Sequence, residues 1–279
     1  NRLPFLPRAD AYCAEAGGRI FYPTDDVDCC RGGSGEFLYA PVDYGGASED
    51  DLKPFGLRED ATWRDRMEAG GAGTESYAGN EVASPRCDGA SDQDEECLID
   101  YESTEGFPVA RDEVPMVRRQ GSLWDFANRL AEDEGLVLDT KSYSTCFRVN
   151  RKHQTAENAD KFDALLEGEI SHPKETIGKS TNLGCIDFYP APSGKRNCCQ
   201  YIANELGLDL ATESVCICDD DNDLGMALAC SHSFIPSLTS ESMVATLREN
   251  QSNFTLTFGP GVRSTDATEA ALNSIYDMI

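Results

Sequence analysis

Apolar and polar residues follow helical and strand-like patterns in turn along the second half of this chain. Helices are expected at 122–130, 156–166, 195–206, 240–249 and 266–278, in addition to one at 59–68. The helix that begins near Ser122 has this residue as its expected N-cap and an apolar face behind it. Strand-like runs separate the helices at 136–138, 143–149, 181–190, 215–217, 234–236 and 254–258. This alternation predicts an α/β protein.

The first half of the chain has a different character. Two or three short strands are expected within 9–40, around two Gly-Gly pairs, and a linker rich in Gly and Asp follows at 43–51. Residues 69–113 are strongly acidic, with scattered Gly and Ser. Their apolar content is too low to build a core, so we expect a disordered insertion there.

Four aspartates gather directly after the strand expected at 215–217, in which Val215 and Ile217 are expected to be buried. They are Asp219, Asp220, Asp221 and Asp223. Unit charges 4 Å apart repel by ~4 kcal/mol at an effective dielectric constant of about 20, so the cluster favours a compensating cation. Because carboxylate oxygens suit a hard divalent ion, Mg²⁺ is the expected partner.

Two other interpretations of the acidic segment compete with a metal site. The acids of a strand-to-helix turn also serve as helix caps, and this alternative stays open from the sequence alone. A calcium-binding loop requires Gly at its sixth position and Glu at its twelfth. Counted from Asp219, these positions hold Leu224 and Cys230, which excludes that loop.

Lys195 is placed against local preference. Pro190, Pro192 and Gly194 close the preceding strand-like segment, so the lysine begins the next helix, where the dipole disfavours a cation. A residue placed in this way often meets a ligand, although a solvated loop lysine remains the alternative. A Walker A loop is excluded because Tyr189 stands where it requires Gly.

These two segments together resemble the haloacid dehalogenase-like (HAD) phosphatases with a large α/β cap, a group that includes sucrose-phosphate phosphatases. Lys195 matches the family's loop lysine, and Asp219, Asn222 and Asp223 match its Gly-Asp-x-x-Asn-Asp motif. Cys218 departs from the family's usual Gly. The segment from Asp187 to Lys195 is similar to the sucrose-phosphatase version of the lysine motif.

The resemblance implies a Rossmann-like HAD core, incomplete at its N-terminus, formed by 1–51 and 178–279, with an inserted α/β cap at 52–177. It also implies a set of roles. Asp219 would bind Mg²⁺ directly and Asp223 through water, whereas Asn222 would orient that shell or touch the phosphate. Lys195 would bridge the nucleophile and the phosphoryl oxygens.

For the cap, Arg148 and Asn182 are the expected contacts to a small phosphorylated sugar. Arg148 is a charge in an otherwise alternating strand, so it also fits a simple exposed face. The resemblance therefore implies a Mg²⁺-dependent phosphoric monoester hydrolase that resembles sucrose-phosphate phosphatase.

The family's nucleophile motif, Asp-x-Asp-Gly-Thr, does not occur in these 279 residues. Asp92 and Asp94 form an Asp-x-Asp pair, but it lies in an acidic run with no strand ahead of it. We expect a truncated sequence whose missing front end holds the nucleophile, so that these residues alone do not hydrolyse a substrate. The alternative is a catalytically inactive HAD-like relative that serves as a regulatory or interaction module.

The composition excludes some classes of binding partner and indicates the cellular compartment of the protein. A net charge of −26 argues against nucleic acid and against an anionic membrane surface. No apolar run reaches the ~18 residues of a membrane span. The 12 cysteines include no Cys-x-x-Cys pair and many lie in apolar segments, so we expect reduced structural thiols rather than zinc ligands. The expected location is intracellular and cytoplasmic, although a missing front end would hide a targeting peptide. The sequence leaves the oligomeric state open.

Overall fold

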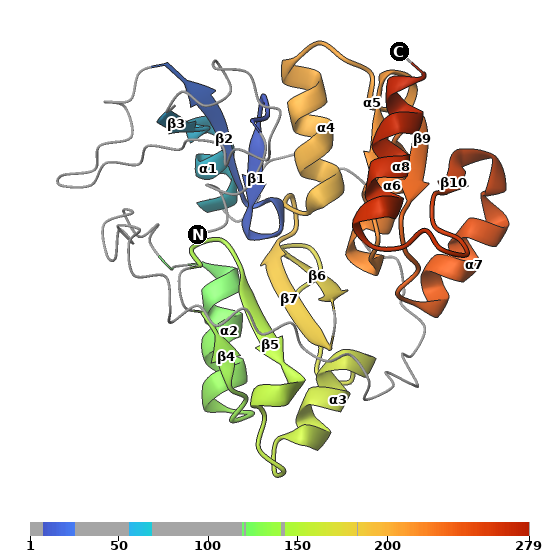
Figure 1. The fold of residues 1–279 in the computed structure, drawn as a ribbon. Helices are drawn as coiled ribbons and strands as arrows, with labels where there is room; N and C mark the ends of the chain where they lie inside the picture. Colours follow the sequence, from blue (N-terminus) through green and yellow to red (C-terminus); the bar gives the residue numbers. More distant parts are fainter. Residues whose placement is uncertain are drawn as a thin grey trace, which may run out of the picture. The chain divides into compact units, whose positions relative to one another are not determined.

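The computed structural model of the chain describes residues 8–25, 56–68, 119, 121–140, 143–182 and 184–278, and it is drawn in Figure 1. The segments expected at 26–40, 43–51 and 69–113 lie outside these residues. The chain divides into two compact units that interleave along the sequence. In the described part, the first unit holds 8–12, 21–25 and 56–60, and the second holds the remainder.

The first unit is built around a pair of antiparallel strands. β2 (Arg19–Thr24) pairs with β3 (Gly56–Glu59) over four residues, from Phe21 opposite Glu59 to Thr24 opposite Gly56. β1 (Tyr12–Ala14) is the third strand of this small sheet, in the order β1-β2-β3, and its residues Cys13 and Ala14 are assigned to the second unit. The short strands expected near the start of the chain are therefore confirmed for the described residues.

The second unit contains a four-stranded antiparallel sheet in the order β4-β5-β7-β6. Its strands are β4 (Leu138–Asp139), β5 (Phe147–Asn150), β6 (Ile177–Asn182) and β7 (Cys185–Pro190). The helices α2 (Ser122–Glu132) and α3 (Ala159–Glu167), green to yellow-green in Figure 1, bury their apolar faces in one core with this sheet. Phe147 and Phe188 stack at the centre of that core, with ring centroids 5.1 Å apart.

The opposite face of this sheet carries polar residues. Because side chains alternate between the two faces of a strand, Arg148, Asp187 and Ser180 form a row across β5, β7 and β6 on the face away from Phe147 and Phe188. The sheet thus has an apolar side covered by helices and a polar side. The predicted boundary between 177 and 178 falls at the start of β6; the domain boundaries themselves stay a prediction.

The second unit also contains a parallel sheet in the order β10-β9-β8. Its strands are β8 (Val215–Ile217), β9 (His232–Ile235) and β10 (Phe254–Leu256). The helices around them are α4 (Lys195–Glu205), α5 (Leu210–Glu213), α6 (Leu224–Ala229), α7 (Glu241–Glu249) and α8 (Thr265–Tyr276). Parallel strands joined through α6 and α7 are the βαβ arrangement of Rossmann-like sheets, so the predicted α/β class is confirmed.

Short helical elements complete the second unit. They are η2 (Glu15–Gly17), α1 (Ala61–Glu68), η4 (Arg151–His153), η5 (Asp221–Asp223) and η6 (Gln251–Asn253). The helix expected at 59–68 is confirmed as α1, and its fully buried Trp63 donates its indole N–H to the Gly17 carbonyl oxygen at 2.9 Å. Of the described helices, none combines the length and the apolar content needed to cross a bilayer.

Three local expectations were wrong: the burial of the β8 residues, the capping role of Ser122 and the start of the strand expected at 143–149. Val215 is 37 % exposed and Ile217 is only partly buried. The buried residue of β8 is Cys216, because the two faces of a strand alternate and the core lies on the face of Cys216. Ser122 is not a cap: it is the first residue of α2, whose N-cap is Gly121 without a side-chain hydrogen bond.

The strand expected at 143–149 begins only at Phe147. The residues before it are diverted by tertiary hydrogen bonds, because the backbone N–H groups of Ser144 and Thr145 donate to the Glu15 carboxylate at 2.9 and 2.6 Å. These amides are therefore occupied by a side chain rather than by a neighbouring strand. A contact across about half of the chain has overridden the local strand preference.

Candidate functional site

The chain leaves β8 in an extended conformation and enters an acidic turn. The backbone N–H of Cys218 donates to the Phe234 carbonyl oxygen at 3.2 Å, which prolongs the contact with β9. Cys218 is 4 % exposed, so its thiol occupies buried space where the family usually has Gly. Asp219 follows as an exposed residue whose backbone carbonyl accepts from Thr239 Oγ1 at 2.7 Å. Asp219 thus lies at the carboxyl end of β8.

Asp220 and Asp221 use their carboxylates to shape the turn. Asp220 is the N-cap of η5, and its Oδ1 accepts the Asp221 backbone N–H at 2.8 Å. Burial raises the pKa of Asp220 above its ordinary value. Asp221 Oδ1 accepts hydrogen bonds from the hydroxyls of Ser240 and Ser242, at the start of α7. The capping interpretation of the acidic segment therefore holds for Asp220, while Asp221 ties the turn to the next helix.

Lys195 meets two of the other matched residues. Its Nζ lies 2.5 Å from Asp223 Oδ1 and 2.8 Å from Asn222 Oδ1. The Asp223 side chain is 11 % exposed and that of Lys195 is 39 % exposed. The cation at the start of α4 is thus held by a buried carboxylate, which offsets its unfavourable place at the helix dipole. The structure brings Lys195, Asn222 and Asp223 together, with Asp219 on the same turn.

Replacing Lys195 with Met is expected to lower the free energy of unfolding by about 1–2 kcal/mol. The substitution leaves the Asp223 carboxylate buried without its cation, and the partial exposure of Lys195 keeps the loss below that of a fully buried pair. Urea denaturation of the 279-residue chain measures it.

The matched control is Lys161→Met, which removes a more exposed ion pair with Glu134 (3.4 Å) and is expected to cost under about 0.5 kcal/mol. The double variant Lys195→Met/Asp223→Asn should recover part of the loss, since it removes both charges. Equal effects of the two single substitutions would contradict the buried-pair interpretation.

The loop before α4 is fixed by the η2 turn. The backbone N–H of Gly194 and the hydroxyl of Ser193 both donate to the Ala16 carbonyl oxygen, at 3.0 and 3.2 Å. A Cβ added to Gly17 would lie 2.7 Å from the Gly194 carbonyl oxygen, so only glycine permits this approach. The start of α4, and with it Lys195, is therefore positioned by a segment almost 180 residues earlier. Apart from the Gly-Gly pair, no sequence pattern indicates this contact.

Arg148 is engaged within its own sheet. Its Nε and Nη2 donate to Asp187 Oδ1 and Oδ2 at 2.6 and 2.8 Å, and the two residues lie opposite each other on β5 and β7. This hydrogen-bonded carboxylate raises the pKa of the Arg148 guanidinium. Asn182 ends β6, opposite Cys185, and its side chain is outside the described part. The role of Arg148 and Asn182 as substrate contacts stays a prediction.

The donor chemistry of the turn fits a magnesium ion. Mg²⁺ is usually bound through one or two carboxylates, with water and substrate phosphate oxygens in the remaining positions. Asp219 and Asp223 can supply those carboxylates. Within the residues that the structure describes, no three His, Cys, Asp or Glu side chains are gathered for a metal ion, so a complete protein cage is not formed there. Further ligands would have to come from water, the substrate or another segment.

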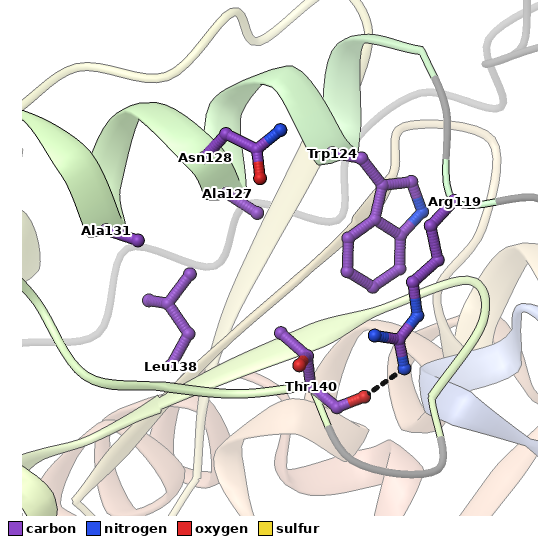
Figure 2. Close-up of a pocket in the computed structure, with 7 residues that line it drawn as sticks. All are labelled: Arg119, Trp124, Ala127, Asn128, Ala131, Leu138 and Thr140. Carbon is purple, nitrogen blue, oxygen red and sulfur yellow. Dashed lines mark hydrogen bonds between the residues drawn. The ribbon is translucent and has the colours of Figure 1, made fainter.

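A separate pocket of about 360 Å³ lies beside α2 (Figure 2). The Arg119 guanidinium lies 4.8 Å from the Trp124 ring centre and donates to the backbone carbonyl oxygens of Thr140 and Tyr143. Asn128 and Leu138 also line this pocket. None of the predicted site residues lines it, so it is distinct from the acidic turn.

No protein-family model and no curated protein matches this sequence. Solved structures do match. One is a sucrose-phosphatase from Synechocystis in complex with sucrose and phosphate, with 18 % identity over 55 % of this chain and 61 % of that chain, and a TM-score of 0.40. Two HAD-like hydrolases from Bacillus subtilis match at 13 % identity (98 % of this chain, 69 % of that chain, TM-score 0.39) and at 14 % identity (38 and 40 %, TM-score 0.27).

The chain thus spans less than two thirds of the sucrose-phosphatase and of one of the HAD-like hydrolases from Bacillus. All three TM-scores are below 0.5. The roles of the site residues consequently rest on the motifs and contacts of this chain.

Proposed function

We propose that the protein is a Mg²⁺-dependent phosphoric monoester hydrolase of the HAD-like type that acts on a small phosphorylated sugar. The observation that carries the proposal is the contact of Lys195 Nζ with Asp223 and Asn222, on the turn that also holds Asp219. A lysine and several acids at the carboxyl end of a parallel strand provide the charged groups that phosphoryl transfer requires.

Each residue of the site has a distinct task in this proposal. When bound, Mg²⁺ would neutralise charge on the phosphoryl group. Asp219 and Asp223 would hold the ion. Lys195 would bind phosphoryl oxygens, and its ammonium is kept in place by Asp223 at 2.5 Å. Asn222 would orient water or the phosphate, because its amide offers both a donor and an acceptor.

The sugar is proposed to contact the polar face of the four-stranded sheet. That face presents the Arg148–Asp187 ion pair and Ser180 in one row, and β6 contacts the η5 turn. Charged and hydroxyl groups in a row are suited to the hydroxyls of a sugar. Because the segment from Asp187 to Lys195 is similar to the sucrose-phosphatase lysine motif, sucrose phosphate is the first substrate to test. A cytoplasmic location is proposed with this substrate class.

The test uses the protein encoded by the natural transcript, sequenced upstream of the codon for Asn1. Under the proposal an in-frame strand ending in Asp-x-Asp-Gly-Thr is found, and that protein releases phosphate from sucrose phosphate with Mg²⁺ but not after chelation. Hydrolysis of other sugar phosphates instead would keep the reaction and change the substrate. A start codon directly before the codon for Asn1, together with no phosphate release, would favour the regulatory-module alternative.

A further inference from the structure

Two cysteines far apart in the sequence meet beside the start of α4. Cys13 of β1 and Cys198 of α4 are separated by 185 positions, and their Sγ atoms lie 3.1 Å apart, with the Cys198 thiol donating to Cys13. Both residues belong to the second compact unit. The sulfur atoms would need to approach by only about 1 Å to reach the length of a covalent S–S bond.

The two thiols differ in exposure. Cys13 is exposed, whereas Cys198 is 0 % exposed. The hydrogen bond from Cys198 lowers the pKa of Cys13, which raises the thiolate fraction of the exposed member. Burial instead raises the pKa of Cys146, and it raises that of Cys199 to about 12. Cys13 is thus the surface residue of the pair, and the buried Cys198 thiol lies directly against its sulfur.

We propose that Cys13 and Cys198 form a peroxide-sensitive thiol pair, in which Cys13 reacts first and Cys198 resolves the product as a disulfide. The Cys13 thiolate attacks one oxygen of hydrogen peroxide, the O–O bond breaks, and Cys13 becomes a sulfenic acid while hydroxide leaves and takes up a proton. Cys198 then attacks the Cys13 sulfur, the S–O bond breaks, and the departing hydroxide takes the Cys198 proton. Two thiols lose two electrons in total, and one peroxide is reduced to two waters.

The disulfide would form next to the candidate site. Cys198 lies three residues after Lys195 on α4, and the Gly194 N–H already contacts Ala16 at 3.0 Å. A covalent link from Cys13 to Cys198 would fix the η2 turn against the start of this helix. The inference goes beyond the proposed function and does not depend on it, because the oxidation is read out on the thiols themselves.

The experiment treats the full 279-residue chain with hydrogen peroxide and analyses it by intact mass and peptide mapping. A variant background with Cys29, Cys30, Cys87 and Cys97 changed to Ser removes the cysteines outside the described residues. Cys13→Ser and Cys198→Ser test the pair. Cys199→Ser is the matched control, since it changes the neighbouring thiol on the same helix, whose Sγ lies 3.3 Å from the sulfur of Met226.

We expect a mass lower by two hydrogen atoms, a Cys13–Cys198 cross-linked peptide, and reversal by dithiothreitol. Cys13→Ser should abolish the cross-link, Cys198→Ser should leave a Cys13 sulfenic acid that dimedone captures, and Cys199→Ser should behave as the parent. In the unmodified fold, iodoacetamide should label Cys13 at least about tenfold faster than Cys199.

Failure to form the cross-link in folded protein, or equal labelling rates of Cys13 and Cys199, would overturn the proposal. The labelling comparison needs no variant, so it remains decisive where Cys198→Ser does not fold.

Discussion

Replacing Asp219 with Asn is expected to remove Mg²⁺-dependent hydrolysis almost completely, with kcat falling by at least about a hundredfold. Asp219 stands exposed at the carboxyl end of β8, where its carboxylate is accessible to an ion. Asn keeps the size of the side chain but lacks the negative charge that a hard cation favours. The measurement is phosphate release at saturating substrate by the protein expressed from the natural transcript.

The adjacent Asp220→Asn is the matched control. Asp220 accepts the Asp221 N–H through Oδ1, and an amide oxygen can accept the same hydrogen bond, so hydrolysis should change little. A second readout uses the 279-residue chain itself: paramagnetic Mn²⁺ should broaden the backbone amide signals around 219–223, and Asp219→Asn should weaken this effect. Retained turnover in Asp219→Asn would remove Asp219 from the proposed site.

Replacing Phe188 with Ala is expected to destabilise the four-stranded sheet by about 3–5 kcal/mol. Phe188 is 0 % exposed, stacks on Phe147 at 5.1 Å and meets the edge of Phe126 at 5.1 Å between ring centroids. Truncation removes these contacts and leaves a cavity between the sheet and α2. This loss is a large share of the ~5–15 kcal/mol that stabilises a typical domain.

Urea denaturation followed by circular dichroism measures this effect, and hydrogen exchange of the β5 and β7 amides locates it. Phe188→Leu is the matched control and should cost less than about 1.5 kcal/mol, because most of the buried volume is retained. Leu256→Ala, at a half-exposed position, should stay within about 0.5 kcal/mol. A loss below about 1 kcal/mol for Phe188→Ala would show that Phe188 is not central to this core.

The local elements of the second half were largely predictable from the sequence. The helices around 195–206, 240–249 and 266–278 appear as α4, α7 and α8 with only small shifts at their ends. Gly207 has a φ of +71° just after α4, as its place behind the apolar pattern indicated. Such features depend on residues that are near one another in the sequence, so hydrophobic periodicity and turn residues predict them.

The exact faces of short elements were not predictable. Val215 and Cys216 are both apolar neighbours in a three-residue strand, and only packing decides which of them is buried. The first residues of the expected 143–149 strand were likewise decided by the Glu15 carboxylate, which no local pattern reveals. A short element holds too few positions for its periodicity to fix an orientation.

Local sequence patterns were sufficient to predict the α/β class, a lysine at the start of a helix and an acidic turn behind a strand. They also placed Asp219, Asn222 and Asp223 within one turn, because their spacing is local. The contact of Lys195 with Asp223 across 28 positions, and that of Cys13 with Cys198 across 185, are seen only in the folded chain. Contacts between distant residues depend on how the whole chain packs, whereas propensity and periodicity act only between near neighbours.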